Sequence, residues 1–396
     1  MSATNHVDTQ PRITGYGAIS AAGTSVARTL QQFAQGKGLA KKAQLLNSPL
    51  TPPLFEVSSL PLPTNNTMRT RQLALHAVRE AMQCAQLIAP LTGKRVGVCL
   101  GTTVACQLND LAFLTQYRET GKASMVPVNR YLNGNLAETI ALETGAQGPH
   151  CTITNACASG TDAIGMATSW LKADICDIVI AGGADELNRV PIAGFNALGI
   201  LSPEQCKPFD KDRQGLNLGE GAGILILETP QSAKNRGIET NLSIASYATA
   251  SDAYHLTAPH PDAKFLKEAI QTALINAHIT PNQITFINAH GTATTNNDHV
   301  EGNALASIFG LDTPILSTKG YTGHTLGAAG GLEAVFATLA LRDQWLPLCA
   351  GFQEKDPDIL ITPITERISI KGNYALSTSL AFGGGNAALI IARSPS

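Results

Sequence analysis

One cysteine stands where a nucleophile would be activated. Residues 150–154 predict a short strand, a turn of small residues follows, and apolar residues at helical spacing then predict a helix. Cys157 lies in that turn, at or just before the start of the helix. Unpaired backbone N–H groups and the positive end of the helix dipole favour a thiolate there, and the thiolate is the attacking species. Cys157 is therefore a candidate nucleophile, with a buried core cysteine as the alternative.

Two histidines and a lysine follow other predicted strands. His290 and His324 each come after a strand and before a helix, at the sheet end where α/β enzymes gather their sites. Lys319 directly follows an apolar strand, so we expect its ammonium to point into the same cleft. Asp298 and Glu301, three residues apart on one helix, could face that lysine. Each residue alone also fits an ordinary structural role, but three similar placements favour a shared site.

A metal site is the competing interpretation of these residues. Zinc would require ligands at short spacing or a carboxylate on the same face, and no such pair occurs, so we expect no metal. Residues 382–386, Phe-Gly-Gly-Gly-Asn, precede the last strand and lack the Lys-Ser/Thr pair of a phosphate loop. Close approach of their backbone to a reacting centre is the better interpretation.

The elements that must position these residues alternate between strand and helix. The 396 residues are 44% hydrophobic, enough for a large core, and the alternation predicts an α/β protein. A comparable order of strands and helices returns after residue 240. We therefore predict a disordered tail at 1–10, a first half at 11–240 that carries the nucleophile, and a second half at 241–396 that carries the histidines.

Composition narrows the partners and the compartment. A net charge of -2, with 15% charged residues, gives no field that would favour nucleic acid. The eight cysteines form no C-x-x-C pair, which fits a reducing cytoplasm better than a disulfide framework or a zinc site. No run has the length of a membrane span, and the first ten residues do not read as a signal peptide.

Together these residues resemble a known family, the elongating β-ketoacyl-acyl-carrier-protein synthases of fatty acid and polyketide assembly. The matching blocks are 156–160 (ACASG), 208–213 with 219–223 (PFDKDR, GEGAG), 251–259 (SDAYHLTAP), 288–292 (NAHGT) and 319–324 with 327–330 (KGYTGH, GAAG). They occur in the family's order within about residues 11–393. The resemblance implies a thiolase-like fold of five α-β-α-β-α layers in two similar halves, which is normally dimeric.

The resemblance also implies roles for individual residues. It implies a Cys157, His290 and His324 site with Lys319 and Glu301 as supports. The other implied contacts are Phe382 as a gate, and Thr292, Thr294, Phe382 and Gly383 against the pantetheine arm. No tightly bound cofactor is implied, because an acyl carrier protein supplies the phosphopantetheine.

The family reaction explains these residue types. An acyl group moves to the cysteine, and malonyl-carrier then loses carbon dioxide to give a carbanion that attacks the acyl-enzyme. A sulfur of low pKa would suit both halves of the reaction. Backbone N–H groups of Cys157 and Phe382 would form the oxyanion hole, and the two neutral imidazoles would stabilise the malonyl enolate.

The carrier protein of this family is acidic. We therefore predict a basic rim around the mouth of the site, drawn from Arg69, Arg71, Lys207 and Arg213. Scattered surface charge is the alternative for each of the four.

Some positions depart from the family pattern. Ala381 and Gly385 flank the gating segment where glycine and threonine or serine are usual, and Gly320-Tyr321 after the lysine is unusual. These departures suggest a specialised polyketide or polyene synthase, and pairing either with a second copy or with a related ketosynthase-like subunit is expected. A housekeeping fatty acid elongation synthase is the first alternative.

Three other classes are disfavoured. A non-condensing chain-length subunit typically lacks the nucleophile, whereas Cys157 is present. A thiolase would use a second cysteine in a C-x-G motif, and residues 349–351 have that shape but lie outside the glycine-rich terminal loop. A starter-unit synthase would pair the cysteine with histidine and asparagine, which His324 argues against.

Overall fold

The computed structural model describes residues 10–46, 48–62, 68–103, 111–126, 128 and 136–394. Residues 1–9 of the predicted disordered tail lie outside these ranges, so the structure does not test that prediction. Within the described residues, no helix combines the length and apolarity needed to cross a membrane.

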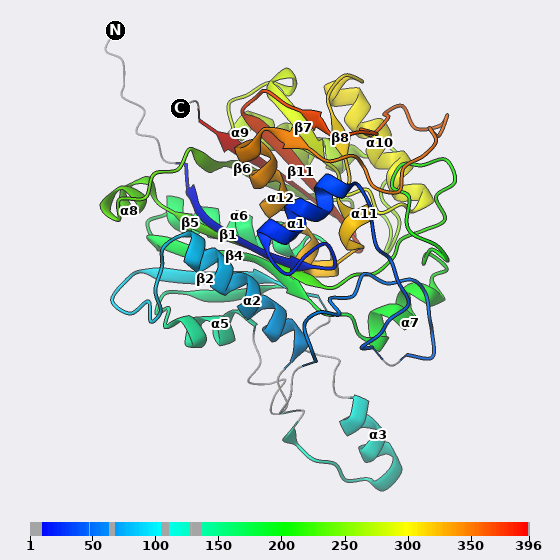
Figure 1. The fold of residues 1–396 in the computed structure, drawn as a ribbon, viewed down its shortest axis with the longest axis horizontal. Coiled ribbons are helices and arrows are strands. Elements are labelled where there is room, and N and C mark those ends of the chain that lie inside the picture. Colours follow the sequence, from blue (N-terminus) through cyan, green and yellow to red (C-terminus); the bar gives the residue numbers. More distant parts are fainter. Residues whose placement is uncertain are drawn as a thin grey trace.

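Ten of the described strands form one large sheet (Figure 1). In chain order these strands are β1 (Arg12–Ser20), β2 (Val96–Gly101), β3 (His150–Ile153), β4 (Ile178–Asp185), β5 (Gly221–Glu228), β6 (Leu242–Ser251), β7 (Ile284–Asn288), β8 (Ile315–Leu316), β11 (Tyr374–Ala381) and β12 (Gly385–Arg393). A separate pair consists of β9 (Trp345–Leu346) and β10 (Ile368–Ser369). The described helices are α1 (Val26–Gln35), α2 (Arg69–Cys84), α3 (Leu111–Thr120), α5 (Leu136–Thr144), α6 (Ser159–Lys172), α7 (Arg189–Ala197), α8 (Pro230–Asn235), α9 (Lys264–Asn276), α10 (Thr295–Phe309), α11 (Lys319–Thr322) and α12 (Ala329–Asp343), with 3-10 turns η1 (Pro281–Gln283) and η2 (Leu326–Ala328).

The sheet repeats one topology twice. Its order is β3-β2-β4-β5-β1 followed by β6-β12-β11-β7-β8. When the five strands of each part are numbered in chain order, the order from the outer edge inward is 3-2-4-5-1 in both parts. In both parts the outer three strands are parallel and the next two pairings are antiparallel. On this repeat we propose two similar halves that meet near residue 240, between α8 and β6.

Helices cover both faces of the sheet, because both faces of its strands are apolar. Along β4, Ile178 and Ile180 join one core cluster with α2 and α5, while Val179 and Ala181 join another with α6 and α12. A third cluster packs α9 and α10 against the strands of the second half. The two five-stranded parts of the sheet therefore form two separate layers, with α6 and α12 between them and further helices outside each part. The order of layers is helix, sheet, helix, sheet, helix.

Glycines let the two halves approach closely beside the nucleophile. A Cβ atom built on Gly160 of α6 would lie 2.7 Å from the carbonyl oxygen of Gly327, and one on Gly330 of α12 would lie 2.7 Å from the amide nitrogen of Thr161. Real Cβ atoms do not occupy such positions. The backbones of the two middle-layer helices are therefore in direct contact.

The same packing corrects one predicted strand end. In the sequence, Gly182-Gly183 follows the strand-like run 177–181 and predicts the end of a strand there, but β4 continues to Asp185. A Cβ on Gly183 would lie 2.4 Å from the carbonyl oxygen of Gly327. Glycine is required here for close approach of η2 to the strand, and not to terminate it.

Candidate active site

Cys157 lies in a tight turn between β3 and α6. Ala156 has φ 42°, a left-handed conformation that costs energy for a residue with a side chain. The hydroxyl of Ser159 accepts a hydrogen bond from the amide of Asn155 at 2.8 Å and donates one to the carbonyl of Ala156 at 2.6 Å. The turn is therefore fixed at both ends, and it holds the sulfur at the start of α6.

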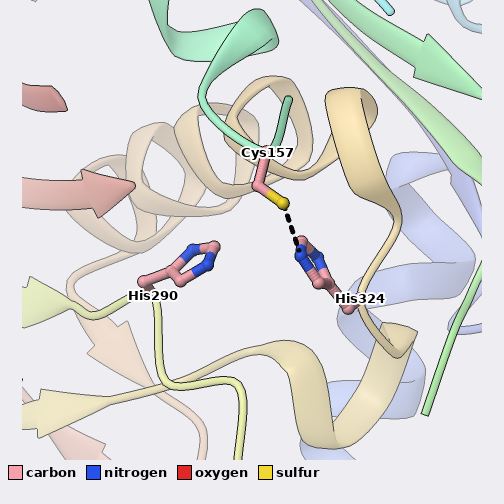
Figure 2. Close-up of side chains that lie close together, drawn as sticks. All are labelled: Cys157, His290 and His324. Atoms are coloured by element: carbon pink, nitrogen blue, oxygen red, sulfur yellow. Dashed lines mark hydrogen bonds between the residues drawn. The ribbon is translucent and has the colours of Figure 1, made fainter. Parts of the chain in front are cut away.

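The fold brings both predicted histidines to this sulfur (Figure 2). His290 follows β7 and His324 follows α11, so the second half supplies both rings. His324 Nε2 lies 2.9 Å from Cys157 Sγ. A ring nitrogen of each histidine and the sulfur all lie within 4.8 Å of one another, and the ring centroids are 5.3 Å apart at 88°. The three side chains share one small, nearly buried space, with Cys157 5% exposed and each histidine 2% exposed.

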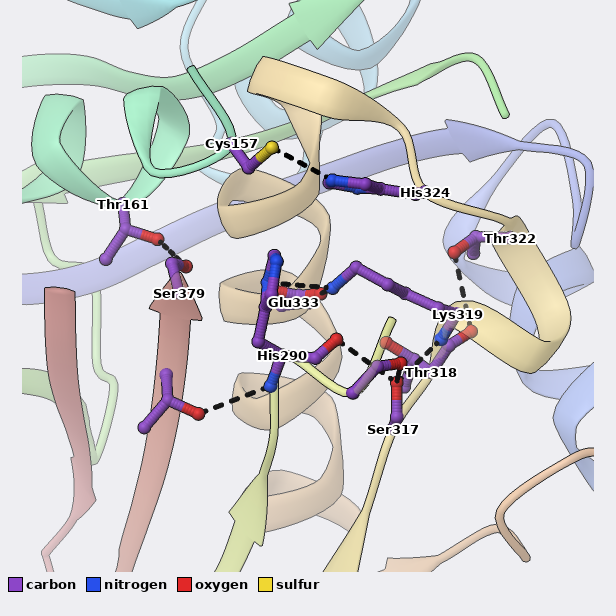
Figure 3. A network of polar contacts seen from close by, with 12 residues as sticks. Cys157, Thr161, His290, Ser317, Thr318, Lys319, Thr322, His324, Glu333 and Ser379 are labelled. Carbon is purple, nitrogen blue, oxygen red and sulfur yellow. Dashed lines mark hydrogen bonds and ion pairs between the residues drawn. The ribbon is translucent and has the colours of Figure 1, made fainter. Parts of the chain in front are cut away.

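Lys319 fixes the tautomer of one histidine. Its Nζ lies 3.2 Å from His290 Nδ1 and also forms a buried ion pair with Glu333, as Figure 3 shows. An ammonium has only donors, so Nδ1 must accept and the proton of the neutral ring must be on Nε2. His290 therefore presents an N–H on the side of its ring away from Lys319.

Both imidazoles are neutral at ordinary pH. Burial lowers the pKa of His290 and of His324 well below the usual value, and the positive charge of Lys319 lowers both further. Neutral rings can donate N–H hydrogen bonds to an oxygen that gains negative charge.

The sulfur itself differs from the low-pKa thiolate that the sequence suggested. Burial raises the pKa of the Cys157 thiol to about 12, and the charge of Lys319 and the backbone N–H of Phe382 oppose this only in part. The resting site therefore holds a thiol beside a neutral His324. The thiol can pass its proton to that ring as it attacks.

This protonation state predicts how Cys157 reacts with an alkylating agent. Well below the pKa of the thiol, the thiolate fraction rises about tenfold for each pH unit. The rate of alkylation by iodoacetamide should therefore rise about 100-fold between pH 7 and 9. Intact mass against time at each pH measures the rate. A rate that reaches a plateau below pH 8 would instead indicate a thiolate of low pKa.

Glu301 does not support the lysine in the expected way. Its carboxylate accepts hydrogen bonds from the amides of His290 and Gly291, both at 2.8 Å, and from the hydroxyl of Thr378 at 2.7 Å. It therefore holds the backbone after β7. Asp298 likewise accepts from backbone amides, those of Phe209 and Ala293, and makes no hydrogen bond with the lysine among the described contacts.

The carboxylate that pairs with Lys319 is Glu333, which the sequence reasoning missed. Glu333 is the one acidic residue between 329 and 341, and α12 is otherwise almost wholly apolar over that stretch. A lone carboxylate in an apolar helix signals a buried partner. That pattern could have identified it.

Phe382 makes two contacts: its backbone approaches the sulfur of Cys157, and its side chain packs on a neighbouring aromatic ring. Its N–H is directed at Cys157, as the oxyanion-hole hypothesis requires. Its ring stacks on Phe195 of α7, with centroids 5.4 Å apart and an interplanar angle of 18°. Gly383 and Gly384 have φ of 88° and 84°, so the segment that carries this ring needs glycine to turn.

A cavity of about 320 Å³ leads to the three side chains. Thr292 and Thr294 line it, and their hydroxyl oxygens are 2.9 Å apart. Phe195 and Phe382 also line it. Gly383, which was expected to contact substrate, is exposed and donates its N–H to the carbonyl of Leu256, outside this lining.

The predicted basic rim is wrong at two of its four positions. Arg69 is 6% exposed and pairs with Glu220. Arg213 is also buried, and it pairs with Asp356. Their charges are neutralised inside the fold.

The other two rim residues differ in their surroundings. Arg71 is half-buried and pairs with Glu143. Lys207 is half-buried and makes no ion pair with any residue that the structure describes.

Two competing interpretations can be tested on this geometry. Cys157, His290 and His324 are close enough to hold a metal ion, but the ammonium of Lys319 against His290 would repel a cation there. Cys349, the second cysteine of the thiolase hypothesis, is buried against the backbone of Ser317 and does not line the cavity. Neither a cation site nor a two-cysteine site is favoured.

Known proteins share this chain's sequence and fold. Residues 50–233 match the family described as beta-ketoacyl synthase, N-terminal domain, and residues 242–353 match its C-terminal domain. The chain is 34% identical over 401 residues to 3-oxoacyl-(acyl-carrier-protein) synthase 2 of Staphylococcus aureus, covering 96% of this chain and 99% of that protein.

Solved structures agree over nearly the whole chain. The ishigamide ketosynthase/chain length factor matches with a TM-score of 0.91 and 31% identity, covering 98% of this chain and 100% of that chain. A type II polyketide synthase acyl-carrier protein in complex with its ketosynthase bound to the hexaketide matches with a TM-score of 0.90 and 29% identity at the same coverage.

The layered fold and the site of one cysteine and two histidines define a thiolase-like enzyme of acyl transfer. The chain belongs to the β-ketoacyl synthase family, as its sequence blocks and its fold class predicted.

Proposed function

We propose that this chain forms β-ketoacyl-carrier products by decarboxylating condensation of an acyl thioester with malonyl-acyl carrier protein. The observation that carries the proposal is the 2.9 Å contact between Cys157 Sγ and His324 Nε2, with the Phe382 N–H directed at the same sulfur. A nucleophile, an acceptor for its proton and an oxyanion donor thus meet at one point.

In the first half-reaction Cys157 attacks the acyl thioester. The backbone N–H groups of Cys157 and Phe382 would hold the oxyanion of the tetrahedral intermediate. The thiol proton passes by way of His324 to the departing pantetheine sulfur. The half-reaction therefore needs no proton from outside the site.

In the second half-reaction malonyl-carrier loses carbon dioxide. The thioester oxygen gains enolate charge, and the Nε2–H of neutral His290 stabilises it, joined by His324 when the proton of that ring is on Nε2 instead of Nδ1. Decarboxylation creates the carbanion without removal of a C–H proton, so a strong general base is not required. The carbanion then attacks the acyl group on Cys157.

The substrates are expected to arrive on the phosphopantetheine arm of an acyl carrier protein. The names of the relatives support this, because they include an acyl-carrier-protein synthase and a ketosynthase in complex with its carrier. Thr292 and Thr294 in the cavity wall are suited to hydrogen-bond the amides of that arm. The chain itself would need no resident cofactor.

The assembly and the pathway follow from the same relatives. Pairing with a second copy or with a related subunit is supported by the ketosynthase/chain length factor likeness. Both polyketide and fatty acid relatives are similar at comparable identity, so assembly of a polyketide or polyene chain and housekeeping elongation are both carried forward. A cytoplasmic location stays a prediction.

Intact mass spectrometry tests the proposed function directly. The protein is incubated with a panel of acyl-carrier proteins and then with malonyl-carrier. We expect one acyl mass on Cys157, followed by its loss as a β-ketoacyl-carrier appears. Absence of acyl mass with every chain offered would contradict the proposal.

Carrier docking is expected to depend on Lys207. Lys207→Glu should raise KM for carrier-bound substrates about two- to fivefold, the effect of one exposed ion pair, and leave small pantetheine thioesters unchanged. Lys94→Glu is the matched control. Lys94 is exposed just before β2, and it is the other end of β2, at Gly101, that contacts α6 beside the nucleophile, so Lys94 lies at the end of the strand away from the site. Equal effects on both substrate types would argue against docking at Lys207.

A further inference from the structure

Condensation, on the proposed function, leaves the site short of one proton. The malonyl carboxylate departs as neutral carbon dioxide, and its electron pair forms the enolate and then the new C–C bond. The bond between the acyl carbon and Cys157 breaks, and its electron pair stays on the sulfur. Acyl transfer has no such deficit, because the thiol proton leaves with the pantetheine sulfur. Each cycle therefore takes up one proton at Cys157 after the C–C bond forms.

Solvent is poorly placed to deliver that proton directly. Cys157 is 5% exposed, and the cavity that reaches it would still hold the arm of the new product. The thiolate also needs the proton strongly, since burial raises the pKa of the thiol to about 12. An internal donor would neutralise the sulfur as it is released.

The charged groups around the sulfur identify the donor. Of the nearby charges, that of Lys319 has the largest effect on Cys157 and lowers the pKa of its thiol, whereas the charges of Asp185 and Glu333 raise it. Asp185 accepts hydrogen bonds from Thr103 and from the amide of Gly327, so its oxygens serve as acceptors.

The remaining acid and base groups have no proton to spare. Glu301 accepts four hydrogen bonds, two from backbone amides and two from neighbouring side chains. His290 and His324 are neutral, because burial lowers the pKa of each, so neither ring carries an extra proton. Glu333 forms a buried ion pair with Lys319, which is 2% exposed.

We propose that Lys319 returns the proton to Cys157 through the ring of His290 as the acyl–sulfur bond breaks. Lys319 Nζ donates to His290 Nδ1 across 3.2 Å, and the proton on Nε2 passes to the sulfur. A ring nitrogen of His290 and Sγ of Cys157 lie within 4.8 Å of each other, a gap that one water molecule spans.

The relay balances in both directions. Delivery leaves Lys319 as a neutral amine, His290 as the Nδ1–H tautomer and Cys157 as a thiol. When the product arm leaves, a hydronium ion from solvent protonates Nε2 through the open cavity. The proton on Nδ1 then returns to the amine, which restores the starting state.

The timing of proton uptake tests the relay in the unaltered enzyme. Acyl-enzyme is mixed rapidly with malonyl-carrier in weak buffer with a pH indicator, and quenched samples report the β-ketoacyl product. We expect product to form before the solvent loses its proton, because Lys319 supplies the first one. Proton uptake that coincides with product formation would overturn the relay.

Two variants separate proton donation from positive charge. Lys319→Met removes both, whereas Lys319→Arg keeps a charged N–H donor that does not deprotonate in proteins. In both variants we expect condensation from preformed acyl-enzyme to fall about 100-fold, the usual contribution of a general acid. If Lys319→Arg condenses at the wild-type rate, charge alone is sufficient and the relay is wrong.

The same experiment keeps folding and the proposed function apart from the relay. Acyl-enzyme formation takes up no proton, so in Lys319→Arg, which keeps the positive charge beside the sulfur, it should fall much less than condensation does. Far-UV circular dichroism of both variants shows whether they are folded. If Lys319→Arg does not acylate, the proton-timing result in the wild-type enzyme decides the relay. If the wild-type enzyme itself makes no β-ketoacyl product, the proposed function fails, whatever the variants do.

Discussion

Cys157→Ala is expected to abolish formation of the acyl-enzyme and to lower condensation by at least about 10⁴-fold, as removal of a catalytic nucleophile does elsewhere. The sulfur is the atom that His324 and the Phe382 N–H both address, and alanine offers no atom that can form a thioester. Decarboxylation of malonyl-carrier should persist in part, because both imidazoles remain. Intact mass reports acylation, and chromatography of the carrier products reports acetyl against β-ketoacyl groups.

Cys349→Ala is the matched control for this experiment. Cys349 is also buried but contacts Ser317 and lies outside the cavity, so the variant should acylate normally. Full condensation by Cys157→Ala would exclude Cys157 as the nucleophile. Loss of acylation in Cys349→Ala with an intact fold would revive the two-cysteine hypothesis.

His290→Ala should lower malonyl decarboxylation by about 10²- to 10³-fold, the loss measured when one oxyanion donor is removed, or roughly 3–4 kcal/mol. Its Nε2–H is oriented by Lys319, and His290 lines the cavity in which the malonyl thioester would lie. The thiol of Cys157 contacts the other ring, so acylation of the cysteine should be retained. Release of carbon dioxide and intact mass measure the two activities separately.

His290→Asn is a useful companion, because an amide can still donate one N–H, and it should recover part of the decarboxylation. His278→Ala controls for loss of a histidine in general, since His278 is exposed. Unchanged decarboxylation in His290→Ala would remove that ring from the mechanism. Equal loss of acylation and decarboxylation would indicate a collapsed site.

The sequence could predict those catalytic residues whose position depends on the strand, turn and helix around them. Cys157 and His290 each follow a strand directly, and parallel strands bring such turns to one end of the sheet, whereas the short helix α11 lies between β8 and His324. The blocks that resemble the family add their roles. The repeated strand order was visible only as a comparable series of elements.

Properties that depend on distant partners could not be predicted in this way. Arg69 is removed from the surface by Glu220, which is 151 residues away in the chain. The partner of Lys319 depends on how α12 packs, and the sequence alone pointed to Asp298 and Glu301 instead of Glu333. The pKa of Cys157 depends on burial, which outweighs the helix terminus that the sequence revealed.

The glycine contacts between α6 and α12 restrict how substrate can enter. The backbones are in contact at Gly160 and Gly330, so the half that carries the nucleophile and the half that carries the imidazoles cannot move apart as rigid bodies without breaking that contact. A shear or hinge motion there would separate the sulfur of Cys157 from the two imidazole rings. We therefore expect any widening of the cavity for the thioester arm to occur at the left-handed turn behind Phe382, whose displacement would leave the scaffold rigid.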